Sequence, residues 1–461
     1  MNKTEHIHFI GIGGYGMSAI AKVLLEMGYK VTGSDVAMSA LAAKLDKQGA
    51  QIHIGHDAQK VHGADLLVYS SAVADDDVEL VEARRLNIPV LHRSEMLARL
   101  LNERKGVAVA GAHGKTTTSS MIALVMEECD ADPTYIIGGE IVNLGTNAKA
   151  GKGDYVVAEA DESDGTFLQY HPTIAVVTNI EADHLENYDG DFANIKAAYV
   201  QFLSQLRPGG KAIVNADDEN IRELLPNIQG ETVTFGIHEK ADYTAEDIQP
   251  DDRKISFLMK YQGETLGTVQ LSVPGIHNVY NAMATIISCL EAGLSFTAVA
   301  AAIVRFQGAK RRFQVIGEVN DVLVVDDYAH HPTEIEATLQ AARATGKKII
   351  AIFQPQRYSR TFFLLDEFSR AFSEADEVII TDIYAPAGEK QIEGVHSSRL
   401  VDLIRENSNS NAHYIADKEE VIMTLASRME PGTLIITMGA GDIWKVSKAL
   451  AEQLESAHNA N

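Results

Sequence analysis

Three places along the chain repeat one pattern, in which a short apolar run leads into a glycine-rich or polar turn and then into a helix-like stretch. The apolar runs cover residues 8–10, 106–110 and 322–325, and the turns after them cover residues 11–17, 111–116 and 326–332. Strands that alternate with helices predict parallel sheets built from βαβ units. Ligands of such sheets bind beyond the carboxyl ends of the strands, where these three turns would lie.

Further apolar runs extend the pattern over the whole chain. We expect strands at residues 30–35, 64–71, 155–159, 174–179, 348–353, 377–381 and 433–437. Residues 231–273 alternate and carry fewer helix signals, which predicts an antiparallel insertion or flank. The expected fold is α/β with three domains, each around a mainly parallel sheet. They are a Rossmann-like domain over residues 1–103, a P-loop ATPase-like domain over residues 104–312 and a second Rossmann-like domain over residues 313–461.

Composition narrows the class of partner. The 64 acidic residues exceed the 40 basic ones, and the formal net charge of −24 argues against nucleic acid or an anionic membrane surface as a partner. The two cysteines, Cys129 and Cys289, are too few for a disulfide framework and are typical of a reducing compartment. Without an expected membrane span or signal peptide, we expect a cytoplasmic protein, either monomer or homodimer.

The most informative motif is GAHGKTTT at residues 111–118. A strand leads into a glycine turn whose backbone N–H groups can surround phosphate oxygens, and Lys115 supplies a cation for the β- and γ-phosphates. Thr116 offers a hydroxyl to Mg²⁺, and a helix expected from Ser119 to Glu127 directs its N-terminus at the same anion. The alternative is an ordinary strand-to-helix turn with a surface lysine, but three consecutive threonines are costly at a helix start unless they bind something.

Two acidic segments, residues 159–164 and 179–184, follow expected strands. Because Glu159 would end a strand beside the phosphate-loop strand, it is our first choice as a ligand of a phosphate-bound Mg²⁺. His184 sits among carboxylates at the end of the next strand, although a lone histidine more often packs. For Asp161, Glu162 and Asp164, a solvated acidic surface is an equally good interpretation.

Asn278 and Asn281 are three residues apart, so they share one face of an expected helix and could bind a purine edge. Simple N-capping by Asn278 explains that residue equally well.

The glycine motif at residues 11–16 resembles a dinucleotide-binding turn, and Asp35 at the end of the second strand could bond a ribose hydroxyl. This permits NAD or another diphosphate such as a UDP-sugar. In the third domain, Arg357 and Arg360 follow a strand, where guanidinium groups suit a carboxylate or phosphate. Surface salt bridges are the alternative for these arginines.

Together these motifs resemble the Mur ligase family, and among its members the one that adds alanine. The resemblance keeps the motif order over nearly the whole chain and rests on residues 11–18, 111–118, 159–164, 179–188, 277–278, 311–313, 326–332 and 353–361. It implies an ATP-dependent ligase that joins L-alanine to the carboxylate of UDP-N-acetylmuramate through an acyl phosphate, for bacterial peptidoglycan precursors. The implied cofactors are ATP and Mg²⁺ or Mn²⁺.

The resemblance also implies roles for individual residues. The UDP-sugar would bind Gly14, Ser34, Asp35, His56, Ser70 and Ser71. ATP would bind Gly111, Ala112, His113, Gly114, Lys115, Thr116, Thr117, His277, Asn278, Asn281 and Arg312. The metal ligands would be Thr116, Glu159 and His184, and alanine would bind Tyr328, His330, Arg357 and Arg360. The catalytic set would be Lys115, Glu159, His184, Arg312, Asp327 and His330.

Three alternatives stay open at this point. A recycling ligase would add a tripeptide to the same sugar, a P-loop ATPase switch would hydrolyse ATP without either substrate, and an NAD-dependent oxidoreductase would use the first glycine turn and leave Lys115 unexplained.

Overall fold

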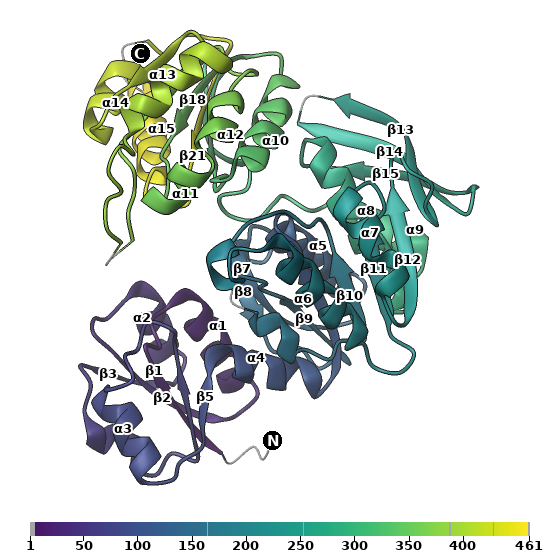
Figure 1. The fold of residues 1–461 in the computed structure, drawn as a ribbon, viewed down its shortest axis with the longest axis vertical. Helices are drawn as coiled ribbons and strands as arrows, with labels where there is room; N and C mark the ends of the chain where they lie inside the picture. Colours follow the sequence, from purple (N-terminus) through teal and green to yellow (C-terminus); the bar gives the residue numbers. More distant parts are fainter. Residues whose placement is uncertain (1–4, 164, 252, 387–388, 427, 460–461) are drawn as a thin grey trace. The chain divides into compact units, whose positions relative to one another are not determined.

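The structure is a computed structural model that describes residues 5–163, 165–251, 253–386, 389–426 and 428–459. Within these residues the strands form three sheets, which confirms the predicted α/β class with mainly parallel sheets (Figure 1). The chain divides into two compact units. The first contains Met1–Glu246, Leu258–Val269 and Tyr280–Phe306, and the second contains Asp247–Phe257, Gln270–Val279 and Gln307–Asn461.

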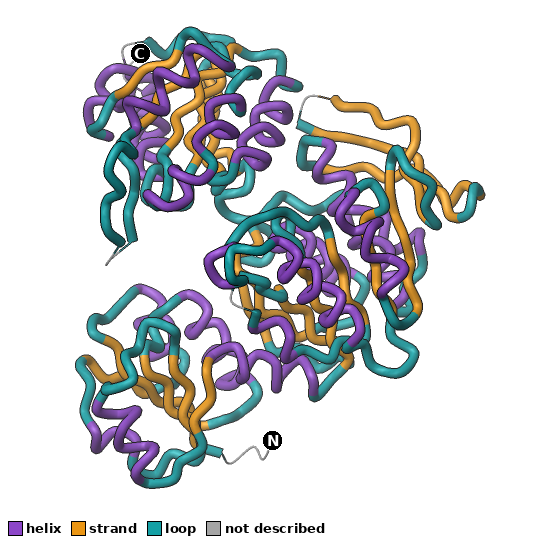
Figure 2. The backbone as a smooth tube through the Cα atoms, in the orientation of Figure 1, coloured by secondary structure: helices purple, strands orange, loops and turns teal. Residues whose placement is uncertain are grey.

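The first sheet has the strand order β3-β2-β1-β4-β5, and all its strand pairs are parallel. On β4, Leu66 and Val68 join one core cluster while Leu67 joins another, so both faces of the sheet are buried under helices (Figure 2). The strand order reverses between β1 and β4, which is where ligands of such sheets bind. The elements are β1 (His6–Ile10), α1 (Tyr15–Glu26), β2 (Lys30–Asp35), α2 (Ala40–Lys47), β3 (Gln51–Ile54), η1 (Ala58–Val61), β4 (Leu66–Tyr69), α3 (Val78–Arg85), β5 (Val90–His92) and α4 (Arg93–Asn102).

The second sheet has the order β15-β14-β13-β12-β11-β10-β6-β9-β7-β8. Strand β6, which precedes the GAHGKTTT motif, lies between β10 and β9 and is parallel to both. The elements are β6 (Lys105–Ala110), α5 (Lys115–Glu128), β7 (Thr134–Ile141), β8 (Thr146–Lys149), β9 (Tyr155–Glu159), η2 (Thr166–Gln169), β10 (Ile174–Val177), η3 (Leu185–Asn187), α6 (Phe192–Ser204), β11 (Lys211–Asn215), α7 (Glu219–Leu224), η4 (Leu225–Asn227), β12 (Glu231–Gly236), β13 (Tyr243–Asp251), β14 (Lys254–Tyr261), β15 (Glu264–Leu271), α8 (Ile276–Glu291) and α9 (Phe296–Ile303).

Two expectations for this region need correction. The helix after the glycine loop begins at Lys115 rather than Ser119, because Gly114 adopts a left-handed conformation and serves as its N-cap. The stretch expected to be an antiparallel flank begins as a parallel one, since β12 pairs in parallel with both β11 and β13. Helix α7 connects β11 to β12, so this βαβ unit extends the parallel sheet.

The third sheet has the order β16-β17-β21-β18-β19-β20, and only the β16–β17 pair is antiparallel among its described pairs. Leu323 and Val325 face one core cluster, and Val322 and Val324 face the other. The elements are β16 (Gln314–Val319), β17 (Val322–Asp327), α10 (Pro332–Arg343), β18 (Lys348–Phe353), α11 (Tyr358–Phe363), α12 (Leu365–Arg370), β19 (Glu377–Ile380), α13 (Ser397–Asn407), β20 (Ala412–Tyr414), α14 (Lys418–Ala426), β21 (Thr433–Met438) and α15 (Trp444–Asn459).

In the part of the chain that the structure describes, no helix combines the length and the apolar character needed to cross a membrane.

Candidate functional site

The turn after β6 needs glycine at two positions. Gly111 has φ +132° and Gly114 has φ +83°, values that favour glycine because it lacks a Cβ. A Cβ on Gly111 would lie 2.1 Å from Thr178 Oγ1, and one on Gly114 would lie 2.6 Å from Asn281 Oδ1. The predicted loop is therefore a tight turn that ends at the N-terminus of α5, an arrangement suited to an anion.

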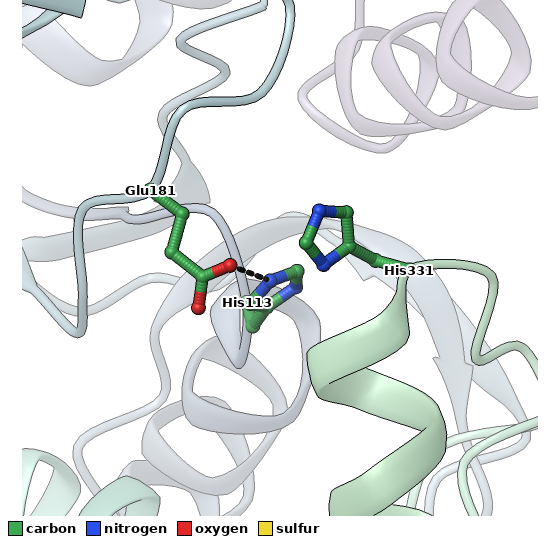
Figure 3. Close-up of side chains that lie close together, drawn as sticks. All are labelled: His113, Glu181 and His331. Atoms are coloured by element: carbon green, nitrogen blue, oxygen red, sulfur yellow. Dashed lines mark hydrogen bonds and ion pairs between the residues drawn. The ribbon is translucent and has the colours of Figure 1, made fainter. Parts of the chain in front are cut away.

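The end of β10 holds this turn in place. The backbone N–H of His113 donates to Asn179 Oδ1 at 2.8 Å, and the His113 carbonyl accepts from Thr178 Oγ1 at 2.6 Å. The His113 ring nitrogen Nε2 lies 3.2 Å from a carboxylate oxygen of Glu181, as the dashed line in Figure 3 shows. These contacts fix the conformation of the turn.

Lys115 makes an ion pair with a buried carboxylate. Its Nζ lies 2.7 Å and 3.0 Å from the two carboxylate oxygens of Glu162, a residue that is 6% exposed. Burial lowers the pKa of Lys115, but Glu162, together with Asp161 and Glu159, outweighs it, so the pKa is raised. The interpretation of Glu162 as solvated acidic surface is therefore wrong. Asp161 is half-buried, and Asp164 lies outside the described residues.

The proposed metal ligands come from three neighbouring elements. Glu159 ends β9 in register with Val109 of β6, as expected, and its carboxylate accepts the Gly138 backbone N–H at 2.7 Å. Thr116 lies in the first turn of α5. His184 follows β10 with φ +56°, a conformation rare for a non-glycine residue, and its Nε2 is 3.5 Å from Asp183. A hydroxyl, a carboxylate and an imidazole form a donor set that accepts Mg²⁺ or Mn²⁺.

The first sheet brings most of the proposed UDP-sugar residues to one edge. Asp35 Oδ2 accepts the Gly13 backbone N–H at 2.8 Å, and a Cβ on Gly11 would lie 3.1 Å from Ser70 Oγ. Gly14 is the N-cap of α1 in the same turn. Ser71 is exposed and its Oγ lies 3.0 Å from His92 Nε2.

Ser34 and His56 lie beside this edge and share an unpredicted partner, Glu79. Ser34 is fully buried and its hydroxyl donates to Glu79 Oε2 at 2.6 Å. The same oxygen lies 3.0 Å from His8 Nε2, and Oε1 accepts the Asp57 backbone N–H at 3.0 Å. Burial raises the pKa of Glu79, but the hydrogen bonds from His8, Ser34 and Asp57 lower it overall. The Ser34 carbonyl accepts the backbone N–H of Gly11 at 2.9 Å, so Ser34 links Glu79 to the glycine turn.

In the second unit, two consecutive arginines flank one aromatic ring. The guanidinium carbons of Arg311 and Arg312 lie 5.0 Å and 5.2 Å from the centre of the Tyr328 ring. Arg311 is anchored by Asp326 at 2.9 Å and by the Gly439 carbonyl at 2.6 Å. Arg312, the predicted phosphate-binding residue, has an Nη1 that lies 3.6 Å from Glu334.

Asp327 and His330 lie beside this pair. Asp327 ends β17, is 6% exposed and accepts the backbone N–H groups of Phe313 at 2.6 Å and Ala329 at 2.7 Å. Burial raises its pKa to about 6, although Arg312 acts in the opposite direction. Its carboxylate therefore holds the segment that carries Arg312. Burial lowers the pKa of His330 to about 4, so the ring is neutral near pH 7.

The three predicted residues of the adenine site lie on α8. Asn278 lies inside α8, which begins at Ile276, so it is not the N-cap, and its amide donates to the Pro274 carbonyl at 2.6 Å. Asn281 accepts from Thr118 Oγ1 at 3.1 Å and so supports the start of α5. For His277, burial, reinforced by Arg312, lowers the pKa to about 4.

Arg357 and Arg360 lie at the start of α11, as expected from the end of β18. Arg357 is exposed and has φ +68°. Arg360 is half-buried, and its Nη1 donates to Gln356 Oε1 at 3.1 Å.

Two glutamates in contact with predicted residues, Glu79 and Glu334, were not predicted, and Glu162 was considered without its contact to Lys115. Glu79 contacts Ser34, Glu162 contacts Lys115 and Glu334 contacts Arg312 and His330. The sequence carries a signal for Glu334 only, because a glutamate at the third position of a helix is typical of a capping box.

Parallel sheets and a glycine loop that ends at Lys115 define an α/β protein of the P-loop nucleotide-binding class. Family models narrow this class: the model described as Mur ligase family, catalytic domain matches residues 6–105, the Mur ligase middle domain matches residues 109–289, and the Mur ligase, glutamate ligase domain matches residues 311–441. The chain belongs to the Mur ligase family, as the resemblance predicted.

Individual relatives agree over nearly the full length. The chain is 48% identical over 463 residues to the UDP-N-acetylmuramate–L-alanine ligase of Symbiobacterium thermophilum, covering 99% of this chain and 96% of the relative. Among solved structures, the UDP-N-acetylmuramate–alanine ligase of Thermotoga maritima matches with a TM-score of 0.81 and 31% identity, covering 98% of this chain and 99% of that one. A murein peptide ligase from Psychrobacter arcticus matches with a TM-score of 0.68 and 25% identity, covering 98% of both chains.

Proposed function

We propose that this protein is an ATP-dependent ligase that joins L-alanine to the carboxylate of UDP-N-acetylmuramate, in the synthesis of bacterial peptidoglycan precursors. The observation that carries the proposal is the 48% identity over 99% of the chain to a ligase of that name. The loop with Lys115 supports the ATP requirement. The recycling ligase is not favoured, because the murein peptide ligase matches less well in both identity and TM-score.

In this proposal the three parts of the chain have separate tasks. Residues 1–103 bind the UDP-sugar at the edge that carries Asp35 and Ser70, and residues 104–312 bind ATP through residues 111–117. Residues 313–461 bind alanine, with Arg360 and Arg357 on its carboxylate and Tyr328 against its methyl group. We place the reaction in the cytoplasm, and the number of subunits stays open between one and two.

In this proposal, residues 104–312 catalyse phosphoryl transfer from ATP to the carboxylate of the sugar. Lys115 exchanges its contact with Glu162 for the transferring phosphoryl group, where it stabilises negative charge. Thr116, Glu159 and His184 would hold Mg²⁺ or Mn²⁺, which when bound neutralises the repulsion between the two anions. Arg312, on the segment that Asp327 holds by its backbone, is the further residue that we assign to the phosphates of ATP.

Phosphate release from ATP tests the proposal directly. The purified protein is incubated with ATP and Mg²⁺ in four mixtures: complete, without UDP-N-acetylmuramate, without L-alanine, and with the muropeptide tripeptide in place of alanine. We expect sustained phosphate release only in the complete mixture, together with a sugar nucleotide whose mass has increased by one alanyl residue. Sustained release without the sugar would indicate an ATPase switch instead, and preference for the tripeptide would indicate the recycling reaction.

A further inference from the structure

Glu334, on the first turn of α10, contacts two residues of the proposed site. Its carboxylate is 11% exposed, its Oε2 lies 3.2 Å from His330 Nδ1, and its Oε1 lies 3.6 Å from Arg312 Nη1. The same Oε2 accepts the backbone N–H groups of His330 at 2.9 Å and His331 at 3.3 Å. One carboxylate therefore fixes the backbone and the ring of His330.

The neighbours of the His330 ring decide which nitrogen carries the proton. Nδ1 lies 2.9 Å from the Tyr328 carbonyl oxygen and 3.2 Å from Glu334 Oε2. Both neighbours are acceptors only, since a carbonyl and an ionised carboxylate have no proton to donate. Nδ1 must therefore be the protonated nitrogen of the neutral ring, which leaves the lone pair on Nε2.

We propose that Glu334 is a positioning residue that holds His330 as its Nδ1–H tautomer, so that Nε2 accepts the amine proton when the amide bond forms. The proposal rests on the proposed ligase function and names the proton acceptor for it. A carboxylate that orients a histidine and stabilises its imidazolium form has the same role in Ser-His-Asp hydrolases.

Proton transfer to His330 accompanies formation of the amide bond. The unprotonated amine of alanine, whose ammonium proton has first passed to solvent, forms a bond to the acyl carbon of the acyl phosphate, and its nitrogen becomes positively charged in the tetrahedral adduct. His330 Nε2 takes a proton from this nitrogen, and the bond between the acyl carbon and the phosphate oxygen breaks with its electron pair on phosphate. The products are the amide and inorganic phosphate, and the proton passes from the imidazolium to solvent.

The charges around His330 agree with this assignment. Burial lowers its pKa most, Glu334 and the Tyr328 carbonyl raise it, and Arg360 and Arg312 lower it, with a result of about 4. The ring is therefore neutral and able to accept a proton at pH 7. Because Glu334 raises this pKa, removal of its charge lowers it further and shifts the acid limb of the activity profile to lower pH.

The Glu334→Gln variant separates positioning from helix capping. Glutamine closes a capping box as glutamate does, so the start of α10 is retained. The amide oxygen takes over the hydrogen bonds from the two backbone N–H groups, while the negative charge beside Nδ1 is lost. The Tyr328 carbonyl then remains the main acceptor for Nδ1–H, so the preference for the Nδ1–H tautomer weakens. The exposed Glu336, two residues later on α10, provides the matched control Glu336→Gln.

The tautomer is measured in the full-length protein labelled with ¹⁵N-histidine, by two-bond ¹H–¹⁵N correlation at pH 7, with His330 assigned by its absence in His330→Asn. We expect a protonated Nδ1 and an unprotonated Nε2 in the wild-type protein and in Glu336→Gln, and a mixture of the two tautomers in Glu334→Gln. Protonated Nε2 in the wild-type protein, or the same tautomer in Glu334→Gln, would overturn the proposal.

Steady-state kinetics of amide formation provide the second reading. We expect Glu334→Gln to lower kcat by roughly 10- to 100-fold, less than the 10²–10⁴ that loss of a general base costs, while Glu336→Gln keeps the wild-type kcat. An unchanged kcat and pH profile would overturn the role of Glu334 in the reaction. The tautomer measurement needs no substrate, so it can fail independently of the ligation assay. If the wild-type protein does not ligate alanine, the proposed function and the proton step are both wrong. If it ligates alanine but shows the other tautomer, only the role of Glu334 is wrong.

Discussion

Two glycine-rich turns in the first unit each connect a parallel strand to a helix, but the side chains around them differ in charge. The turn at residues 11–16 follows β1, the middle strand of the first sheet, and the turn at residues 111–114 follows β6, between β10 and β9. Each leads into the N-terminus of a helix, α1 or α5. The backbone alone would therefore predict an anion site in both places.

The side chains from neighbouring strands make the difference. In the first turn the Gly13 N–H donates to the Asp35 carboxylate. The neighbouring Ser34 hydroxyl donates to the buried carboxylate of Glu79. In the second turn the His113 N–H donates to the neutral amide of Asn179, and Lys115 adds a cation. The first turn thus offers acceptors, which suit sugar hydroxyls and the uracil N–H, whereas the second offers positive charge, which suits a polyphosphate.

The comparison predicts the largest effect for Lys115→Ala, which removes the cation from the second turn. Without it, negative charge that develops on the transferring phosphoryl group is unstabilised, and we expect phosphate release to fall by roughly 10²–10³-fold or more. The substitution also removes the partner of the buried Glu162 and the contacts of Nζ with the turn, so the free energy of unfolding should fall, and the fold is verified separately. Phosphate release and circular dichroism measure the two properties.

Lys105→Ala is the matched control, because Lys105 begins the same strand at its opposite end and pairs with the exposed Asp154. Its activity should equal that of the wild-type protein. Retention of activity in Lys115→Ala would remove the second turn from the reaction.

A smaller effect, on the first turn, is expected for Glu79→Gln. The amide can no longer accept all the hydrogen bonds from His8, Ser34 and Asp57, so we expect the free energy of unfolding to fall by about 1–3 kcal/mol. Displacement of Ser34 should raise the KM for the UDP-sugar while the KM for ATP stays unchanged. Chemical denaturation and steady-state kinetics test both statements.

This stability difference should depend on pH. The pKa of Glu79 is lowered from 4.5 in the folded protein, so its contribution is fully present above pH 4.5 and is lost as the pH falls through the folded value. The difference in the free energy of unfolding between the wild-type protein and Glu79→Gln should therefore shrink in acid.

The control is Glu82→Gln. Glu82 lies three residues after Glu79 on α3 and pairs with Arg85 and His62, so its substitution should leave the KM for the sugar unchanged. An equal change of KM for both substrates in Glu79→Gln would contradict a role confined to the first turn.

Local patterns predicted the strands and turns well, and long-range pairs poorly. Strands β2, β9 and β18 have the predicted bounds, and Glu159 lies beside the phosphate-loop strand as the alternation of strands and helices required. The pairs Glu79–Ser34 and Glu162–Lys115 were not predicted, because their members lie 45 and 47 residues apart in sequence. Which distant carboxylate becomes buried depends on how helices and loops pack over a sheet, which periodicity does not encode.

The smallest effect is expected for Asp35→Asn, which tests whether the first turn uses its charge or only its shape. The asparagine oxygen can still accept the Gly13 N–H, so the turn should keep its conformation. Only the negative charge is lost, and since a hydrogen bond to a charged group is stronger than a neutral one by about 1 kcal/mol, the KM for the UDP-sugar should rise roughly fivefold. Asp46→Asn on the exposed side of α2 is the control. If Asp35→Asn binds the sugar as the wild-type protein does, the acceptors of the first turn hold its backbone and take no part in recognition, and the contrast with the second turn would then rest on Lys115 alone.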